Sequence, residues 1–410
     1  MLLRFEVANH RSILDPVELS MIAVDKDRPA TRSFDLLNEQ VLTVAGIYGP
    51  NASGKSNVLE ALAWLSSAVE RSLRSWDNAI PRDPFKFGDG PRVPSTYEVE
   101  MIADDVRYTY RLEITDSEVL SESLVSYPKR QPRTLFEREG MEISFRRGLE
   151  NTSGARELLT PTTLALSAVM RFSEPEVQPL GRDLRNIMGL GVRSKSYRSL
   201  SPTTESIFRE DDGTPQDVRD SAIALLRFAD FGIGDVQVTV LEDSATKLSL
   251  DRASLSLLHR AAGQEIPFDL KDESAGTRTW FRLIAPALFA LRKGRVLLFD
   301  EIDASLHPRL SARLLDLFQD PFTNPHGAQL IFTTHDTSLL NSLNRDEVWL
   351  TEKADNGATT LTALAEFGGD KVRRSLNLEK AYLQGRFGAV PELDQIALRR
   401  ALGVASDDKS

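Results

Sequence analysis

The sequence predicts an α/β fold, in which a mostly parallel sheet flanked by helices is built from both ends of the chain. Two observations point to that sheet. Residues 41–48 form an apolar run before an amphipathic helical pattern, and helix and strand patterns alternate from residue 279 onward. Such alternation is typical of parallel strands connected by helices. A third observation concerns residues 97–147, whose short alternating runs with polar breaks favour antiparallel strands instead.

The N-terminal segment is expected to begin with two strands, at residues 3–7 and 17–23, separated by the turn of residues 9–12. The run at residues 41–48 has the continuous apolar character of a buried strand. Apolar side chains then recur at helical spacing and predict one long amphipathic helix. These side chains are Val58, Leu59, Leu62, Leu65, Val69 and Leu73.

The middle of the chain is expected to interrupt the parallel sheet. Residues 157–190 and 214–231 have helical periodicity, and the Ser-, Thr-, Pro- and Asp-rich stretch 193–215 between them suits a loop. Strand character returns at residues 235–250. We therefore expect one core domain that is split by a long insertion.

The C-terminal half of the core is expected to alternate between helices and strands. The expected elements are a helix at Trp280–Leu291, a strand at Val296–Phe299, a helix at Leu310–Phe318 and a strand at Gln329–Thr333. The basic, aromatic and glycine-bearing segment from residue 366 follows neither pattern.

Composition excludes several kinds of site and partner. The chain has 410 residues and no cysteine, which removes disulfides, thiolate metal sites and cysteine nucleophiles. Its net charge of −10 differs from the basic balance that is usual in proteins that hold nucleic acid constitutively. We find neither a signal-peptide pattern nor an apolar run of the roughly 18–20 residues that span a bilayer. A cytoplasmic protein without a membrane partner is therefore expected.

Two local clusters of basic residues leave a contact with nucleic acid or with a partner protein open. One consists of Lys129, Arg130 and Arg133, and the other of Arg193, Lys195 and Arg198. The alternative, which we favour, is that both clusters are solvated loops.

A glycine-rich segment after the strand at 41–48 has the pattern of a phosphate-binding loop. Its residues are Gly49, Pro50, Asn51, Ala52, Ser53, Gly54, Lys55 and Ser56, which match G-x-x-x-x-G-K-[ST]. Glycines let successive N–H groups point at phosphate oxygens, and the following helix adds the positive end of its dipole. Lys55 is expected to contact the β- and γ-phosphates, and the Ser56 hydroxyl to bind Mg²⁺. These eight residues and Asn57 form the predicted ATP site.

The strand at 296–299 ends in two acids that extend this prediction. Asp300 lies at the carboxyl end of the strand, where ligands of open α/β sheets bind, and its carboxylate is expected to hold Mg²⁺. Glu301 is expected to orient or deprotonate the attacking water. His335 follows the next buried strand and is expected to sense a γ-phosphate. Glu301 and His335 are therefore the predicted catalytic residues.

The turn before the helix at 280–291 has the sequence Glu273-Ser274-Ala275-Gly276-Thr277. Ser274 is suited to capping a helix, and Gly276 permits close approach of another backbone. Taken alone, the turn is explained by helix capping.

Together, and in this order along the chain, these motifs resemble those of ABC-type ATPases, in particular the SMC, RecF and OLD branch. The turn Asn9-His10-Arg11-Ser12 resembles the N-F-R-S turn of that branch, and residues 305–308 resemble its D-loop. Runs at 84–87, 135–138 and 379–388 are similar to those of bacterial ATPases from abortive-infection and restriction loci (RloA- or AbiLi-like). These runs extend the similarity over nearly the whole chain.

The resemblance implies an ABC-type P-loop ATPase head that uses ATP and Mg²⁺. Two heads would form a homodimer, head to tail around two ATP molecules. In it, Ser274 and Gly276 of one subunit would contact the γ-phosphate held by the other. Hydrolysis would then open the dimer. Arg11, in the turn similar to N-F-R-S, joins the expected nucleotide-binding residues.

On this basis the chain divides into four expected segments. They are the N-terminal half of the head with an antiparallel β subdomain (1–150), a helical insertion (151–234), the C-terminal half of the head (235–365) and a tail (366–410). Whether Arg386 in the tail reaches the nucleotide or only packs stays open, and packing is favoured.

The sequence departs from the family pattern in several places. The typical L-S-G-G-Q is replaced by Glu-Ser-Ala-Gly-Thr, which weakens the expected γ-phosphate contacts. There is neither a heptad array for a coiled-coil arm nor a second acidic cluster resembling a TOPRIM nuclease. None of the glutamines in the insertion has the context of a Q-loop glutamine. These are Gln131, Gln178, Gln216, Gln237 and Gln264.

Functions of several classes are compatible with such a head. We favour an ATPase that gates a separate effector protein, such as a nuclease, in an anti-phage system of the abortive-infection kind. The alternative is a RecF- or SMC-like DNA-repair ATPase that binds DNA when ATP is bound, against which the acidic balance argues mildly. Glu301 argues against a nucleotide switch that does not hydrolyse ATP. A transporter subunit is the least favoured class.

Overall fold

The computed structural model describes residues 1–34, 37–146, 149, 153–172, 174–192, 202–209, 214–229, 232–241, 252–304, 306–367 and 377–388. A six-stranded mixed sheet and a seven-stranded antiparallel sheet organise this part of the chain, and two smaller sheets accompany them. The expected α/β fold, with a mostly parallel sheet and a separate antiparallel sheet, is confirmed.

The six-stranded sheet has the order β11-β15-β16-β5-β17-β18. Its strands are β5 (Val44–Tyr48), β11 (Met188–Leu190), β15 (Val296–Phe299), β16 (Gln329–Thr333), β17 (Val348–Lys353) and β18 (Thr359–Ala363). Every neighbouring pair is parallel except β17 with β18. The parallel neighbours β15, β16 and β5 therefore end at the same edge of the sheet, and each is followed by one of the predicted polar motifs.

Both faces of this sheet are buried, which explains why its strands are apolar at successive positions. In β15, Val296 and Leu298 belong to a core shared with α1 and the antiparallel sheet. Their neighbours Leu297 and Phe299 belong to a second core, shared with α7 and α8. The two-residue period of a strand thus divides one apolar run between two cores.

The seven-stranded sheet is antiparallel and has the order β10-β9-β8-β7-β6-β1-β2. Its strands are β1 (Leu2–Ala8), β2 (Val17–Ser20), β6 (Ser95–Ala103), β7 (Val106–Ile114), β8 (Val119–Tyr127), β9 (Arg133–Glu139) and β10 (Glu142–Phe145). The predicted hairpin set at 97–147 is therefore confirmed, and it continues the sheet that begins with the predicted N-terminal pair.

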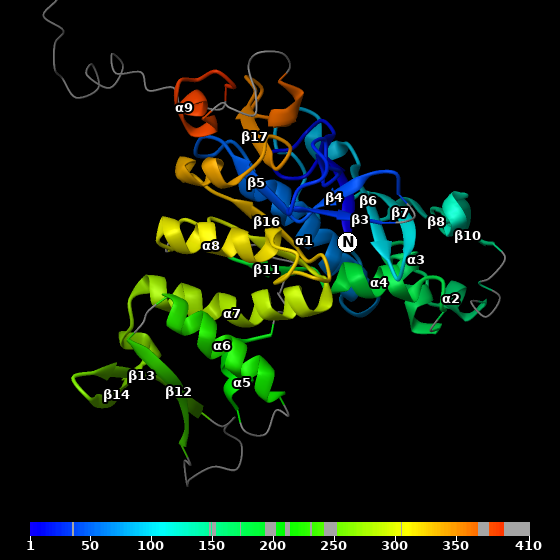
Figure 1. Cartoon of the computed structure of the whole chain (residues 1–410). Helices are drawn as coiled ribbons and strands as arrows, with labels where there is room; N and C mark the ends of the chain where they lie inside the picture. The colour runs from blue at the N-terminus through cyan, green and yellow to red at the C-terminus, as the bar shows by residue number, and fades with distance from the viewer. Residues whose placement is uncertain are drawn as a thin grey trace, which may run out of the picture.

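The helices cover both sheets. They are α1 (Lys55–Ser75), α2 (Ser153–Glu157), α3 (Ala165–Val169), α4 (Gln178–Arg185), α5 (Thr204–Phe208), α6 (Gln216–Ala229), α7 (Ala275–Lys293), α8 (Pro308–Gln319) and α9 (Leu378–Leu383). A three-stranded sheet contains β12 (Ile233–Leu241), β13 (Arg252–Ala261) and β14 (Gln264–Asp269). Figure 1 shows this sheet with α5 and α6 below α7, on the far side of the molecule from α9 and β17.

Two expected elements are wrong in detail. The run at 41–48 is two strands rather than one, because β4 (Gln40–Leu42) pairs with β3 (Thr31–Ser33) while β5 pairs with β16. The segment 157–190 is not helical throughout, since its last residues form β11 and pair with β15. Three residues are too few to show a strand period in the sequence. Of the strand run expected at 235–250, the part up to Leu241 belongs to β12, and residues 242–250 lie outside the described residues.

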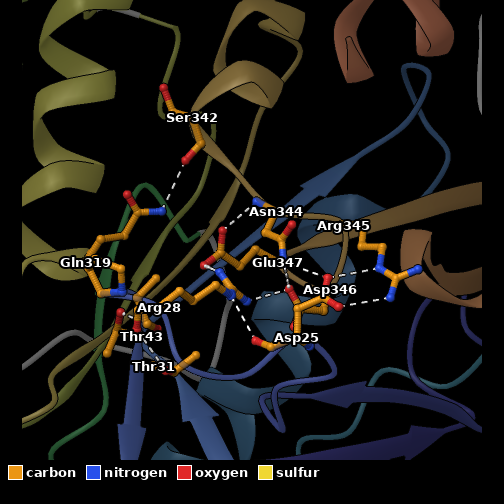
Figure 2. Close-up of polar contacts among 12 residues, drawn as sticks. Asp25, Arg28, Thr31, Thr43, Gln319, Ser342, Asn344, Arg345, Asp346 and Glu347 are labelled. Carbon is orange, nitrogen blue, oxygen red and sulfur yellow. Dashed lines mark hydrogen bonds and ion pairs between the residues drawn. The ribbon is translucent and has the colours of Figure 1, made fainter. Parts of the chain in front are cut away.

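Figure 2 shows a cluster of charged side chains that joins the loop after β2 to the start of β17. Arg28 Nη1 donates to Glu347 Oε1 and Arg28 Nη2 donates to Asp346 Oδ1, each at 2.5 Å. Arg345 pairs with Asp25 at 3.0 Å. The backbone carbonyl of Glu347 accepts an N–H from β5. The cluster therefore fastens a polar loop to the central strand that precedes the phosphate-loop motif.

Candidate active site

The glycine-rich segment forms a compact loop between β5 and α1. Gly49 and Gly54 have φ values of +150° and +104°, and Ala52 lies at +63°. A side chain on Gly54 would collide with the Thr359 hydroxyl, and one on Gly49 would collide with Thr351. Both glycines are therefore required by backbone conformation and by the close approach of the β17–β18 hairpin. Pro50, Asn51 and Ser53 complete the loop.

Lys55 folds back over this loop at the start of α1. Its Nζ donates to the carbonyl oxygens of Gly49 and Pro50, at 2.8 and 3.0 Å. Burial lowers the pKa of Lys55 to about 8, and the nearby carboxylates of Asp303, Asp300 and Glu301 oppose this change. The ammonium group therefore stays largely charged at neutral pH, where it can attract phosphate oxygens.

Ser56 and Asp300 meet where α1 begins and β15 ends. Ser56 Oγ donates to Asp300 Oδ1 at 2.8 Å, and Thr333 Oγ1 at the end of β16 donates to the same oxygen at 2.6 Å. Mg²⁺ keeps most of its water ligands and takes one or two oxygens from a protein. The Ser56 hydroxyl and the Asp300 carboxylate fit that requirement. In the described parts of the chain, no group of three or more His, Asp or Glu side chains is placed to hold a metal ion.

Glu301 is exposed beside Asp300, in a left-handed backbone conformation with φ of +54°. Its N–H donates to Thr333 Oγ1 at 2.8 Å. Non-glycine residues rarely adopt that conformation, and where one does, its surroundings hold it there. The Thr333 bond helps to maintain this backbone conformation, and Glu301 lines the cleft described below.

His335 lies at the end of β16, and Asp303 fixes the backbone that carries it. The His335 N–H donates to Asp303 Oδ1 and Oδ2 at 3.2 Å, and Thr334 Oγ1 donates to Oδ1 at 2.7 Å. Lys55 Nζ approaches His335 Nδ1 at 3.4 Å. Burial, followed by the charge of Lys55, lowers the pKa of His335. Since an ammonium group can only donate, Nδ1 is the acceptor and the ring proton of His335 is assigned to Nε2.

A cleft of about 560 Å³ opens next to Ser56, Asp300 and Glu301. Its other walls come from the turn before β2, from α1, from the end of β11 and from α7. The residues are Arg11, Glu60, Leu190, Gly191, Thr279, Arg282, Phe299 and Ala304. The end of β11 therefore contributes to the site, although no sequence signal identified that strand.

Arg11 reaches the cleft but is already paired. Its Nη2 lies 2.5 Å from Glu60 Oε1, and its N–H donates to the Asp83 carbonyl oxygen at 2.6 Å. Asn57 Nδ2 donates to Ser12 Oγ at 2.6 Å, so its amide supports the neighbouring turn. Both side chains therefore connect α1 to the turn of residues 9–12, next to the predicted phosphate position.

Ser274 and Gly276 stand apart from this cleft. Ser274 is exposed at the N-terminus of α7, and its Oγ accepts the Thr277 N–H at 3.1 Å. The predicted cap is therefore present. Neither residue is among those that line the cleft, whereas Thr279, one turn later on the same helix, is.

Some predicted features lie elsewhere or outside the described residues. The five candidate glutamines do not line the cleft. Arg386 is exposed near α9. Ser305 of the expected D-loop and the basic cluster at 193–198 lie outside the described residues. In the parts of the chain that the structure describes, no helix is both long and apolar enough to cross a membrane.

Sequence reasoning missed the residues that assemble the site from a distance. Asp303 and Thr333 hold the backbones of His335 and Glu301, and Thr351 and Thr359 back the glycine-rich loop. Asp303 and Thr333 are within three residues of predicted site residues, which is a usable signal. The two threonines of the hairpin have no such signal.

Comparison with known proteins identifies a family and shows a similarity to solved structures of SMC head domains. The family model described as "AAA domain, putative AbiEii toxin, Type IV TA system" matches residues 44–341. The SMC head domain from Thermotoga maritima is 15% identical, with a TM-score of 0.42 over 88% of this chain and 98% of that one. An SMC head bound to the C-terminal winged-helix domain of ScpA is 16% identical, with a TM-score of 0.48 over 88% and 97%. No curated protein matches the sequence.

Proposed function

Since the chain belongs to the AAA-domain family that its residues 44–341 match, we propose that it binds ATP with Mg²⁺ and hydrolyses ATP to ADP and phosphate. One observation carries the proposal. Three neighbouring parallel strands place Lys55 and Ser56, Asp300 and Glu301, and His335 at one edge of the sheet. Residues more than 200 positions apart thus form one site.

Each side chain has a distinct proposed role. The loop N–H groups and Lys55 bind the phosphates, and Ser56 with Asp300 would hold Mg²⁺, which stabilises negative charge on the phosphate oxygens. Glu301 orients the water and accepts its proton. His335, whose ring proton is assigned to Nε2, donates a hydrogen bond from that nitrogen to the γ-phosphate.

The proposed ATP hydrolysis is tested by measuring the rate of phosphate release from ATP for wild type and for Glu301→Gln. Removing a general base costs about 10²–10⁴-fold in rate, whereas the amide preserves shape and ATP binding. Glu118→Gln, which changes an exposed carboxylate in a distant turn, is the matched control. If Glu301→Gln hydrolyses ATP at the wild-type rate, Glu301 is not the base and the proposed site is wrong.

We further propose an ATP-dependent homodimer in which Ser274 and Gly276 face the ATP of the second subunit. The exposed N-terminus of α7 supports this, because a helix N-terminus binds anions and its own cleft does not include those residues. Light scattering with ATP should show a dimer that Glu301→Gln traps and that an added Ser274→Arg abolishes. A monomer under all conditions, with ATP bound, contradicts the head-to-tail arrangement.

As the biological role, we propose that the ATPase gates a separate effector protein, such as a nuclease, in a bacterial anti-phage system. The family description, which refers to a toxin of a type IV system, supports this proposal. Phage plating on cells carrying the gene and its neighbours should show protection that Lys55→Ala removes. Protection that survives Lys55→Ala would show that nucleotide binding does not gate the effector.

The alternative, ATP-dependent DNA binding, has one supporting observation. Lys129 and Arg130 are exposed in the turn between β8 and β9, both with positive φ, while Arg133 is paired with Glu176. Electrophoretic mobility shifts with ATP at two salt concentrations test it, since phosphate contacts weaken steeply with salt. Loss of binding in a Lys129→Glu, Arg130→Glu variant would favour this function.

A further inference from the structure

The hairpin of β17 and β18 lies directly behind the phosphate-loop motif and touches it through side-chain hydroxyls. Thr359 Oγ1 donates to the Ser53 carbonyl oxygen at 2.8 Å and lies 2.7 Å from Ser12 Oγ. Thr351 Oγ1 donates to the Tyr48 carbonyl oxygen at 3.1 Å and lies 2.6 Å from Ser53 Oγ. Both threonines are buried.

The direction of each bond follows from the number of protons. A hydroxyl has one proton, and Thr359 uses its proton for the Ser53 carbonyl. Ser12 must therefore donate to Thr359, and Ser12 in turn accepts from Asn57 Nδ2 at 2.6 Å. The result is a directed chain from α1 through the turn after β1 and the hairpin to the loop.

The second chain is directed in the same way. The single hydroxyl proton of Thr351 is donated to the Tyr48 carbonyl oxygen, so Ser53 Oγ must be the donor to Thr351 Oγ1. Ser53 is thus held at its carbonyl oxygen by β18 and at its hydroxyl by β17. Such buried and fully directed networks favour one backbone geometry over alternatives.

The orientation of the Ser53–Gly54 peptide has a consequence for ligand binding. In a trans peptide the C=O and N–H bonds point in opposite directions, and the described chain contains no cis peptide. Because the Ser53 carbonyl points to Thr359, the Gly54 N–H points away from the hairpin, toward the side on which phosphate would bind. A rotated peptide would instead present a carbonyl oxygen to the phosphate.

We infer that Thr359 is a positioning residue for ATP, because its hydroxyl sets the Ser53–Gly54 peptide with the N–H toward the phosphate. Thr351 supports the same loop at its start. This inference rests on the proposed ATP binding, and it assigns a role in that binding to a strand that lies 306 positions from Ser53 in the sequence.

The test uses the full chain with AMP-PNP and Mg²⁺, measured by isothermal titration calorimetry. Thr359→Val keeps the shape but removes the hydroxyl, and should weaken AMP-PNP binding about 5- to 10-fold. Thr359→Ser keeps the hydroxyl but loses a methyl group, and should bind within about twofold of wild type. Thr360→Val, at the exposed neighbouring position of β18, is the matched control.

Which of the two Thr359 variants binds AMP-PNP more weakly distinguishes a positioning role from a packing role. If the side chain only fills space, Thr359→Ser leaves a cavity and is the worse variant, whereas positioning makes Thr359→Val the worse one. In ATP turnover, Thr359→Val should raise KM for ATP with kcat nearly unchanged. Equal AMP-PNP binding by wild type and Thr359→Val overturns the inference alone. Failure of the wild type to bind AMP-PNP overturns the proposed function as well.

Discussion

Replacing Glu347 by glutamine is expected to make the stability of the protein less sensitive to pH. The Glu347 side chain is 1% exposed, accepts from Arg28 Nη1 at 2.5 Å and from the Asn344 N–H at 2.7 Å. Burial raises the pKa of Glu347 to about 7, against the opposing effect of Arg28. Glutamine cannot ionise, and its single carbonyl oxygen can replace either Oε1, the acceptor for Arg28, or Oε2, the acceptor for Asn344, but not both.

The magnitude follows from the two pKa values. The pKa of 4.5 in the unfolded chain rises to about 7 in the fold, so the folded state binds the proton more tightly. The stability contributed by that proton is complete below pH 4.5 and is lost as pH rises through 7. At about 1.4 kcal/mol per pH unit, the loss amounts to ~3 kcal/mol.

Urea unfolding followed by tryptophan fluorescence, between pH 5 and pH 8, measures this loss. Wild type should lose about 2–3 kcal/mol relative to Glu347→Gln over that range. Glu366→Gln changes an exposed position, and its free energy of unfolding should vary with pH in the same way as that of wild type. A difference that is constant with pH, or that favours wild type as pH rises, refutes the reasoning. It would mean that Arg28 outweighs burial and keeps Glu347 ionised.

Three further changes probe the site and its supports. Gly54→Ala places a methyl group against the Thr359 hydroxyl and should abolish ATP binding, measured by calorimetry, without preventing folding. Asp303→Ala frees the backbone of His335, so kcat should fall at least about tenfold while the Kd for ATP changes little, by single-turnover and binding assays. Arg28→Ala leaves the buried Asp346 carboxylate without this cation and should lower the free energy of unfolding by roughly 3–5 kcal/mol, by urea titration.

Much of the fold could be predicted because its signals are local. The long helix after residue 54 and the hairpins at 97–147 follow from periodicity, and the structure has them within a few residues. The similarity to abortive-infection ATPases is confirmed by the family match over residues 44–341. The division of 41–48 at Thr43 was missed, because it depends on which sheet each half joins.

The site residues that could be predicted are those that belong to motifs with fixed sequence spacing, and the structure brings Lys55 close to His335 and Ser56 close to Asp300. Their individual roles stay predictions. The residues that orient them could not be found from the sequence, because Thr351 and Thr359 touch the loop across about 300 positions. A threonine in a strand is unremarkable until the partner across the fold is known.

The order of strands in the six-stranded sheet also bears on how the chain becomes functional during synthesis. Central strand β5 is made early, yet its neighbours β16 and β17 come from residues 329–353. Contacts between such distant segments form slowly, because a long loop must close first. A growing chain would therefore carry its glycine-rich loop without sheet partners until most of the protein had emerged. Under the proposed function, a nascent chain would therefore not bind ATP until β16 and β17 had been made.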